Sequence, residues 1–151
     1  MLTLQEIADR IEIQDLLVRY TRAIDQKDWD LLDRVFVPDA KLDYTSSGGI
    51  AGSLPEVKAW LAKALSVFPE TMHLIGNTEV SLDGDTARTR TAVYNPMFFA
   101  RAEGGRDHFA VGAYYVDEMV RTPRGWRISS RREDHAFTEG ELPKALVIPD
   151  D

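Results

Sequence analysis

The sequence predicts an α+β domain in which helices pack on one face of an antiparallel sheet. Apolar residues recur at helical spacing up to about residue 68. From residue 71 onward apolar and polar side chains alternate, and short turns that contain glycine separate the alternating runs. Helices followed by strands are typical of α+β domains. Because long strands twist, we expect a hollow on the concave side of the sheet, and the functional site within it.

The first segment predicts a long helix from about Leu4 to Ile24. Thr3 and Glu6 have the spacing of a capping box at its start. One face of this helix is apolar, at Leu4, Ile7, Ala8, Ile11, Leu16, Tyr20 and Ile24. Asp25 follows where the apolar face should continue, which makes it the first candidate functional residue.

Two shorter helices and a strand are expected next. Asp28 can cap a short helix that Pro38 and Asp39 end, with a buried side formed by Trp29, Leu32, Val35 and Phe36. The alternation in AKLDYT predicts a short or edge strand with one face formed by Ala40, Leu42 and Tyr44. A second capping box, Ser53 with Glu56, predicts a third helix that stops before Pro69.

The rest of the chain predicts four strands joined by tight turns. The expected strands are Thr71–Leu82, Thr86–Ala100, about Arg106–Arg121 and Trp126 to about Phe137. The turns between them contain Asp83-Gly84, Gly104-Gly105 and the Pro-Arg-Gly sequence at 123–125. The last residues include two prolines and terminal acids, which predicts a docked or frayed extension.

Length and charge narrow the class of protein. A chain of 151 residues suits one domain, with a core over about residues 4–137 and a C-terminal extension over 138–151. The formal net charge of -7 disfavours nucleic acid and anionic membranes as partners. The chain has no cysteine, and its three histidines match no metal-ligand spacing, so we expect no metal site. It also lacks a nucleotide-binding loop and a secretory signal, so we expect no cofactor and a cytoplasmic location.

Several short motifs occur in a distinctive order, namely Tyr20, Asp25, the DWD at 28–30, the PDA before LDY, MHLIGN around His73 and GWRI near the end. Their order and spacing resemble the SnoaL-like family of the nuclear transport factor 2-like (NTF2-like) superfamily. The resemblance covers roughly residues 7–137 and implies a cone, in which helices close a strongly curved, mixed, mostly antiparallel sheet around a deep pocket. Scytalone dehydratase, bile acid 7α-dehydratase, hexachlorocyclohexane dehydrochlorinase and polyketide cyclases belong to the same group.

The resemblance implies a pair of catalytic residues. In dehydratase and dehydrochlorinase relatives a helix aspartate at the position of Asp25 pairs with a strand histidine at the position of His73. Tyr44 matches a pocket tyrosine of scytalone dehydratase, and Tyr20 one of the bile acid dehydratase. Other pocket positions differ from scytalone dehydratase, which implies a more apolar substrate here; they are Ile24 and the substrate-binding candidates Met97, Phe109 and Val111.

The chemistry of imidazole supports this pair independently. An imidazole with a pKa near 6.5 accepts a proton at neutral pH, and a carboxylate on its other nitrogen fixes the tautomer and favours the charged form. His73 is therefore the expected base and Asp25 the group that orients it, while Tyr20 and Tyr44 offer hydroxyl donors. In the structural alternative Asp25 caps the turn at Gln26-Lys27, His73 is a satisfied buried histidine, and the tyrosines belong to the core.

The remaining polar clusters suggest surface roles. We expect His108 and His135 at the surface or at the rim of the pocket. Arg131 and Arg132 have the charge to bind an anion, but a solvated strand face is the expected role.

These observations together predict a cofactor-independent lyase or isomerase that removes a proton from a small hydrophobic, cyclic substrate in a dehydratase-like elimination. A non-catalytic ligand-binding or dimerisation module is the alternative, and a polyketide-cyclase-like enzyme is a third option. A homodimer, or else a trimer, is expected because the later strands carry more apolar side chains than one core absorbs, namely Val93, Tyr94, Phe98, Phe99, Tyr114, Tyr115 and Met119.

Overall fold

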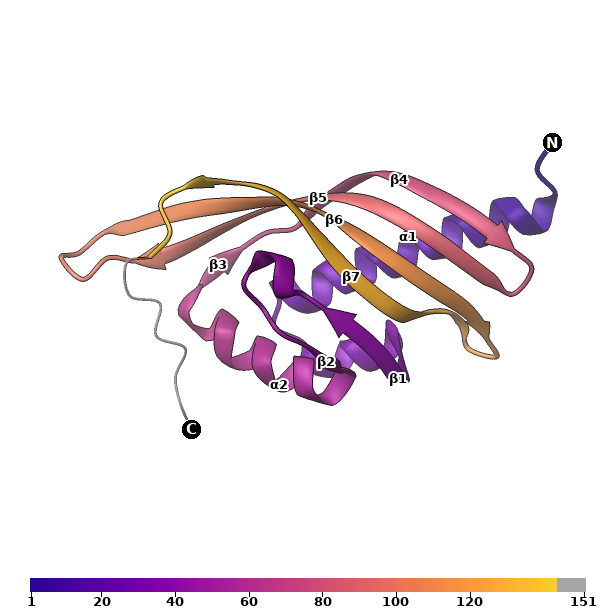
Figure 1. Cartoon of the computed structure of the whole chain (residues 1–151), viewed down its shortest axis with the longest axis horizontal. Helices are drawn as coiled ribbons and strands as arrows, with labels where there is room; N and C mark the ends of the chain where they lie inside the picture. The colour runs from indigo at the N-terminus through magenta and orange to yellow at the C-terminus, as the bar shows by residue number, and fades with distance from the viewer. Residues whose placement is uncertain (144–151) are drawn as a thin grey trace.

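In the computed structural model, which describes residues 1–143, helices pack against a strongly curved seven-stranded sheet. Figure 1 shows the long strands β4 to β7 arching over α1 and α2. The strand order is β2-β1-β7-β6-β5-β3, and β4 pairs with β5 as well. Among the strand pairs of residues 1–143, β1 and β7 run parallel and the others are antiparallel. The sheet is therefore mixed and mostly antiparallel, as the family resemblance implies.

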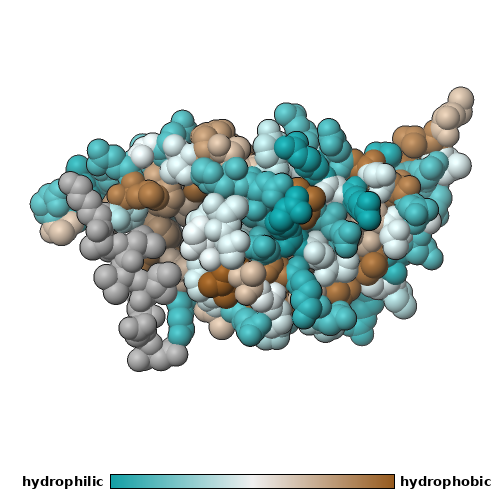
Figure 2. All heavy atoms as spheres, in the orientation of Figure 1, coloured by the Kyte–Doolittle hydropathy of each residue, from teal (hydrophilic) through white to brown (hydrophobic). Residues whose placement is uncertain are grey.

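Helix α1 spans Leu4–Asp25 and begins with the predicted capping box between Thr3 and Glu6. Its predicted apolar face is wrong in the N-terminal half. Leu4, Ile7 and Ile11 are exposed at 86%, 42% and 60%. Figure 1 shows the start of the helix reaching past the tip of the β4–β5 hairpin, and Figure 2 shows apolar atoms gathered at this end of the molecule. The face that the sheet does cover is Asp9, Ile13, Leu16, Leu17, Tyr20, Thr21, Ala23 and Ile24.

The second helix is shorter than predicted. Asp28 caps it as expected by accepting from the Leu31 amide, but it is a 3-10 helix, η1, that spans only Trp29–Arg34. Strand β1, Phe36–Asp43, then begins before Pro38 instead of after it. A register shift between Phe36 and Lys41 accommodates the proline, which has no amide hydrogen to donate to the parallel partner β7.

The segment after β1 forms one wall of the fold. Tyr44 ends the strand and precedes a short 3-10 helix, η2, Thr45–Ser47, and β2, Ala51–Ser53, returns along β1. Helix α2, Leu54–Ala64, starts with the predicted capping box of Ser53 and Glu56 and continues into η3, Leu65–Val67. Because Gly49 lacks a side chain, the loop passes close to Tyr44; a Cβ there would lie 2.8 Å from the Tyr44 Cβ.

The predicted strand Thr71–Leu82 is wrong as a single element. It consists of β3, Glu70–Thr71, and β4, Leu74–Asp83, and both pair with β5. His73 lies in the interruption between them. Its amide donates to the Asp25 carboxylate at 2.9 Å instead of to a neighbouring strand. Asp25 and His73, the two candidate functional residues from the sequence, thus form the contact that interrupts the strand.

The long strands follow the prediction closely. β5 spans Thr86–Ala100 and β6 spans Arg106–Thr122, as two strands of a hairpin. β7 begins at Gly125 but runs to Gly140, beyond the predicted end at Phe137, because residues up to 140 still pair with β6. The predicted extension falls mainly on residues 144–151, which lie outside the described residues.

The core fills the space between α1, α2 and the concave side of the sheet. Its largest fully buried side chains include Trp126, Phe36, Ile13, Leu16 and Arg131. Three of the side chains expected at a subunit interface, Val93, Tyr115 and Met119, are buried in this core, whereas Tyr94 is 36% exposed. Within residues 1–143 none of the helices has the length and apolar character needed to cross a membrane.

Candidate active site

A cavity of about 420 Å³ opens on the concave side of the sheet. Its size falls in the range of small-molecule sites. Most of its wall is apolar, and a few polar groups interrupt that wall. The aromatic and aliphatic lining is Tyr20, Ile24, Tyr44, Trp60, Leu61, Ala64, Leu65, Phe68, Val93, Met97, Phe109, Val111, Tyr115 and Leu142, and the polar lining includes Ser46, Ser47, His73, Asn95, Glu133, His135 and Thr138.

Asp25 and His73 meet at the wall of this cavity, as the sequence predicts. One carboxylate oxygen of Asp25 lies 2.6 Å from the ring Nδ1 of His73, and the other accepts from the His73 amide at 2.9 Å. Asp25 therefore holds residue 73 at two points, one on the backbone and one on the ring. The carboxylate does not serve as a cap for the Gln26-Lys27 turn, which was the structural alternative.

This contact fixes which ring nitrogen of His73 is free. An ionised carboxylate only accepts hydrogen bonds, so Nδ1 carries the proton and Nε2 has an unshared electron pair. The His73 side chain is 7% exposed and lines the cavity. Nε2 is thus the nitrogen that remains to accept a proton from a bound molecule.

Asn95, which the sequence analysis missed, holds the segment that carries His73. Its side-chain amide donates to the Thr71 hydroxyl and to the Met72 carbonyl, both at 2.9 Å, and lies 3.5 Å from the His73 Nδ1. Asn95 belongs to β5, which pairs with both β3 and β4, the two strands that precede and follow His73. It therefore fixes the irregular backbone at residues 71–73 from the sheet side.

The two candidate tyrosines contact each other. The hydroxyl groups of Tyr20 and Tyr44 are 2.8 Å apart, and both side chains are buried at the cavity wall. Tyr20 also packs edge-on against His73, with ring centroids 6.4 Å apart. Burial raises the pKa of both hydroxyls well above the usual value for tyrosine, so both remain protonated. One hydroxyl donates to the other, and the hydrogen of the accepting hydroxyl is left for another acceptor.

Arg131 contradicts its predicted solvated position. Its side chain is fully buried and forms two hydrogen bonds of 2.7 Å with the equally buried Asp117. The guanidinium carbon lies 4.0 Å from the ring centroids of both Tyr20 and Tyr115. Although burial opposes its charge, Asp117 keeps the pKa of Arg131 above its usual value. Arg131 is buried because its side chain points from β7 toward the core, where it packs against Tyr20 and Tyr115. Arg132, by contrast, is exposed and pairs with Asp134.

Glu133 is a second polar residue that the sequence analysis missed. It lines the cavity, and only 9% of it is exposed. Burial raises the pKa of its carboxyl, an effect that the Ser47 hydroxyl and the charges of Arg131, His73 and His135 partly offset. The sequence spacing could have predicted this burial, because residues two apart on a strand face the same side of the sheet and Glu133 is two residues after the buried Arg131. The run RREDH conceals that signal because it reads as a solvated charged segment.

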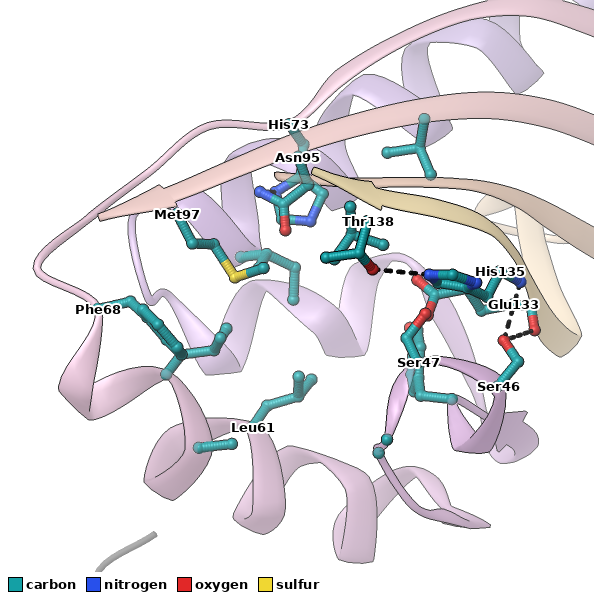
Figure 3. A pocket seen from close by; sticks show the side chains of 18 of the residues that line it. Ser46, Ser47, Leu61, Phe68, His73, Asn95, Met97, Glu133, His135 and Thr138 are labelled. Carbon is teal, nitrogen blue, oxygen red and sulfur yellow. Dashed lines mark hydrogen bonds between the residues drawn. The ribbon is translucent and has the colours of Figure 1, made fainter. Parts of the chain in front are cut away.

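The other predicted residues divide between the cavity and the surface. Met97, Phe109 and Val111, the substrate-binding candidates, all line the cavity. His135 is exposed but borders the cavity, with a ring nitrogen 2.8 Å from the Thr138 hydroxyl, as Figure 3 shows. His108 is exposed and stacks on Phe98 away from the cavity. Across residues 1–143, no group of three or more His, Cys, Asp or Glu side chains has the arrangement of a metal site.

The curved mixed sheet, the helices packed against it and the enclosed pocket define the NTF2-like class of α+β cone folds. Within that class the chain belongs to the SnoaL-like domain family, whose model matches residues 5–132. An uncharacterised protein of Mycobacterium tuberculosis is 51% identical over 138 residues, which cover 91% of this chain and 92% of the relative.

Solved structures of similar shape have several functional descriptions. A proposed aromatic ring hydroxylase from Novosphingobium aromaticivorans is 27% identical, with a TM-score of 0.79 over 90% of this chain and 95% of that one. A proposed scytalone dehydratase from the same organism is 16% identical, with a TM-score of 0.78 over 92% and 91%. A hexachlorocyclohexane dehydrochlorinase is 22% identical, with a TM-score of 0.77 over 97% of each chain. At these identities the last two show a shared fold.

Proposed function

We propose that this protein is a cofactor-independent lyase that removes a proton and a leaving group from neighbouring carbons of a small hydrophobic, cyclic molecule. The observation that carries the proposal is the contact of both Asp25 oxygens with residue 73 at the cavity wall. It orients one histidine nitrogen toward the carboxylate and leaves the other for a substrate. The dehydratase and dehydrochlorinase among the structural neighbours catalyse eliminations by name, which supports the same reaction class.

The elimination follows from the roles of the two side chains. His73 Nε2 accepts a proton from a substrate carbon, the electrons of the broken C–H bond form the double bond, and the leaving group departs with the electrons of its own bond. The resulting imidazolium is hydrogen-bonded to Asp25, which stabilises the positive charge as it forms. The hydroxyl that accepts in the Tyr20–Tyr44 contact has a hydrogen to donate to a carbonyl next to the acidic carbon.

The cavity wall indicates the kind of substrate. Its walls are mainly aromatic and aliphatic, and about 420 Å³ suits a molecule of one or two rings. Phe109 and Val111 contribute apolar surface at positions where the scytalone dehydratase pattern has polar residues. We therefore expect a substrate with few polar groups besides those that react.

The test begins with ligand discovery and then removes the base. Cyclic alcohols, hydroxyketones and haloalkanes are screened by thermal shift, and those that bind are assayed for turnover. His73→Gln should retain folding and binding while turnover falls by about 10² to 10⁴-fold, the usual contribution of a general base. Asp25→Asn should lower turnover similarly, because an amide cannot stabilise the imidazolium and can select the wrong tautomer.

His108→Gln is the matched control, because it makes the same change at an exposed histidine outside the cavity. Its turnover should equal that of the native chain. A ligand that stabilises the native chain, is never transformed by it, and binds His73→Gln equally well would instead favour the non-catalytic binding module.

A further inference from the structure

We infer that Glu133 is the proton donor to the leaving group, so that the cavity eliminates water from a hydroxylated substrate in preference to a halide. This inference rests on the proposed function, in which His73 takes the proton from carbon. With this inference the site has an acid, Glu133, besides the base His73. The leaving group is also restricted to hydroxyl groups, which need a proton in order to leave.

The position of Glu133 suits this role. It projects from β7 into the same cavity as His73, and 9% of it is exposed. In Figure 3, Phe68 and Met97 border one side of the cavity and Glu133 with Ser47 the other, while His73 and Asn95 lie between them. A substrate ring that fills the space between these side chains touches the base and the carboxyl at different atoms.

Ion pairing does not explain the burial of the Glu133 carboxyl group. Arg131, two residues earlier on the strand, already makes both of its short ion-pair contacts with Asp117. Within residues 1–143 the ion pairs of the structure do not include Glu133, although a buried carboxylate normally requires a cation or several hydrogen bonds. A carboxyl group buried at the cavity wall beside one hydroxyl group, with no ion pair, suggests a chemical role.

The surroundings of Glu133 favour the neutral acid. Burial is the largest influence on the pKa of its carboxyl and raises it; the groups that face it and oppose this rise are the Ser47 hydroxyl, Arg131, His73 and His135. Tyr115 lies opposite Glu133 on β6 and is kept neutral by its own burial. A carboxyl held in its neutral form at higher pH than usual is what an acid catalyst needs, since only the neutral form has a proton to give.

The proton balance explains why the leaving group is a hydroxyl. Hydroxide is a poor leaving group, so the C–O bond breaks readily only if the oxygen gains a proton as the bond breaks. His73 takes H⁺ from one carbon, Glu133 gives H⁺ to the oxygen on the next, and the products are an alkene and water. The imidazolium and the Glu133 carboxylate then exchange a proton through solvent, which restores both groups. Chloride leaves as an anion and needs no such proton.

A pair of probes with one carbon skeleton tests this assignment. 3-Hydroxycyclohexanone and 3-chlorocyclohexanone both yield cyclohexenone, with loss of water or of hydrogen chloride, and enzymatic rates are corrected for the uncatalysed reaction. Glu133→Gln should lower turnover of the hydroxy compound by about 10² to 10⁴-fold, and that of the chloro compound by less than about tenfold. His73→Gln should lower both. Glu118→Gln, at an exposed position of β6, is the matched control.

Two results would overturn the role of Glu133 while leaving the proposed function intact. One is an equal loss on both probes in Glu133→Gln. The other is a carboxyl that titrates at or below the ordinary range of glutamate when the native chain and Glu133→Gln are compared by ¹³C NMR. Loss of the alkaline limb of the pH profile for the hydroxy compound in Glu133→Gln supports the role. A native chain that transforms neither probe contradicts the proposed elimination itself, and the NMR titration still tests Glu133.

Discussion

Two aspartates, Asp117 and Asp25, each pair with a basic side chain on either side of Tyr20, and their hydrogen bonds are similar although their surroundings differ. Asp117 and Arg131 make two contacts of 2.7 Å with both side chains fully buried. Asp25 holds residue 73 through contacts of 2.6 and 2.9 Å, but the His73 and Asp25 side chains are 7% and 22% exposed, and His73 lines the cavity. Tyr20 packs against both basic side chains, with its ring against the Arg131 guanidinium and edge-on to the His73 ring.

The difference between the pairs lies in what each can exchange. A guanidinium stays protonated at every physiological pH, so the Asp117–Arg131 pair cannot pass a proton to a ligand and instead fixes the position of the tyrosines. An imidazole gains and loses its proton near neutral pH, so the Asp25–His73 pair can act on a bound molecule. Under the proposed function, similar hydrogen bonds thus serve structure at Asp117–Arg131 and chemistry at Asp25–His73.

Breaking the buried pair should have the largest effect on stability. Asp117→Asn leaves the Arg131 charge buried without compensation, which costs about 3–5 kcal/mol in the free energy of unfolding. Urea denaturation measures the loss. Asp134→Asn, which breaks the exposed Arg132–Asp134 pair, is the control and should not differ measurably from the native chain. Equal stability of the two variants would contradict a structural role for Asp117.

A third pair, in which Asp9 is buried and Arg121 is partly exposed, extends the comparison to the pH dependence of stability. Asp9 accepts two hydrogen bonds from Arg121, at 2.6 and 2.7 Å, and one from the Trp126 ring nitrogen at 3.1 Å. The bonds from Arg121, more than any other influence, lower the pKa of Asp9 in the folded state. Its contribution to stability is therefore complete above the unfolded value, about 3.9, and is lost as pH falls toward the folded value.

The stability difference between the native chain and Asp9→Asn should consequently be largest near neutral pH and shrink as pH falls below about 4. Thermal unfolding in a pH series measures this difference. Asp39→Asn, which makes the same change at an exposed position, is the control and should differ little from the native chain at neutral pH. A difference for Asp9→Asn that grows on acidification would refute the assignment.

The smallest effect on stability and turnover is expected at Tyr44, which contacts Tyr20, the neighbour that Arg131 and His73 share. Tyr44→Phe removes one hydroxyl from the 2.8 Å contact with Tyr20, at a cost of about 1 kcal/mol in stability. Turnover should fall less than in His73→Gln, because the histidine and its carboxylate remain in place. Tyr94→Phe, at an exposed tyrosine on the same sheet, controls for loss of a hydroxyl. A loss of turnover in Tyr44→Phe as large as that in His73→Gln would make Tyr44 part of the proton-transfer chemistry.

Much of the fold and the central pair of the site were predictable because they depend on local rules. The capping boxes at Thr3 and Ser53 and the turns between the long strands specify where elements start and stop. Asp25 drew attention because it interrupts an apolar helical face, and the order of motifs around His73 supplied its partner. Each of these signals lies within a few residues of the feature it predicts, or in a spacing shared with a family.

The remaining features depend on contacts between distant parts of the chain. Leu4 and Ile11 have helical spacing, yet they are exposed because the sheet covers a different face of α1. Arg131 and Glu133 belong to a charged run, and only the position of β7 beneath the tyrosines and beside the cavity buries them. The split of the strand at His73 likewise results from Asp25, which lies 48 positions earlier in the chain.

That split makes the backbone amide of His73 a built-in reporter. Ordinary strand amides are protected from exchange with deuterated solvent by the neighbouring strand, but this one is protected by the side chain of Asp25. Its exchange rate therefore follows the opening of a single carboxylate contact and not the fraying of the sheet edge. A molecule that enters the cavity and tightens that contact slows the exchange at this amide, which gives a readout of binding in the absence of any turnover.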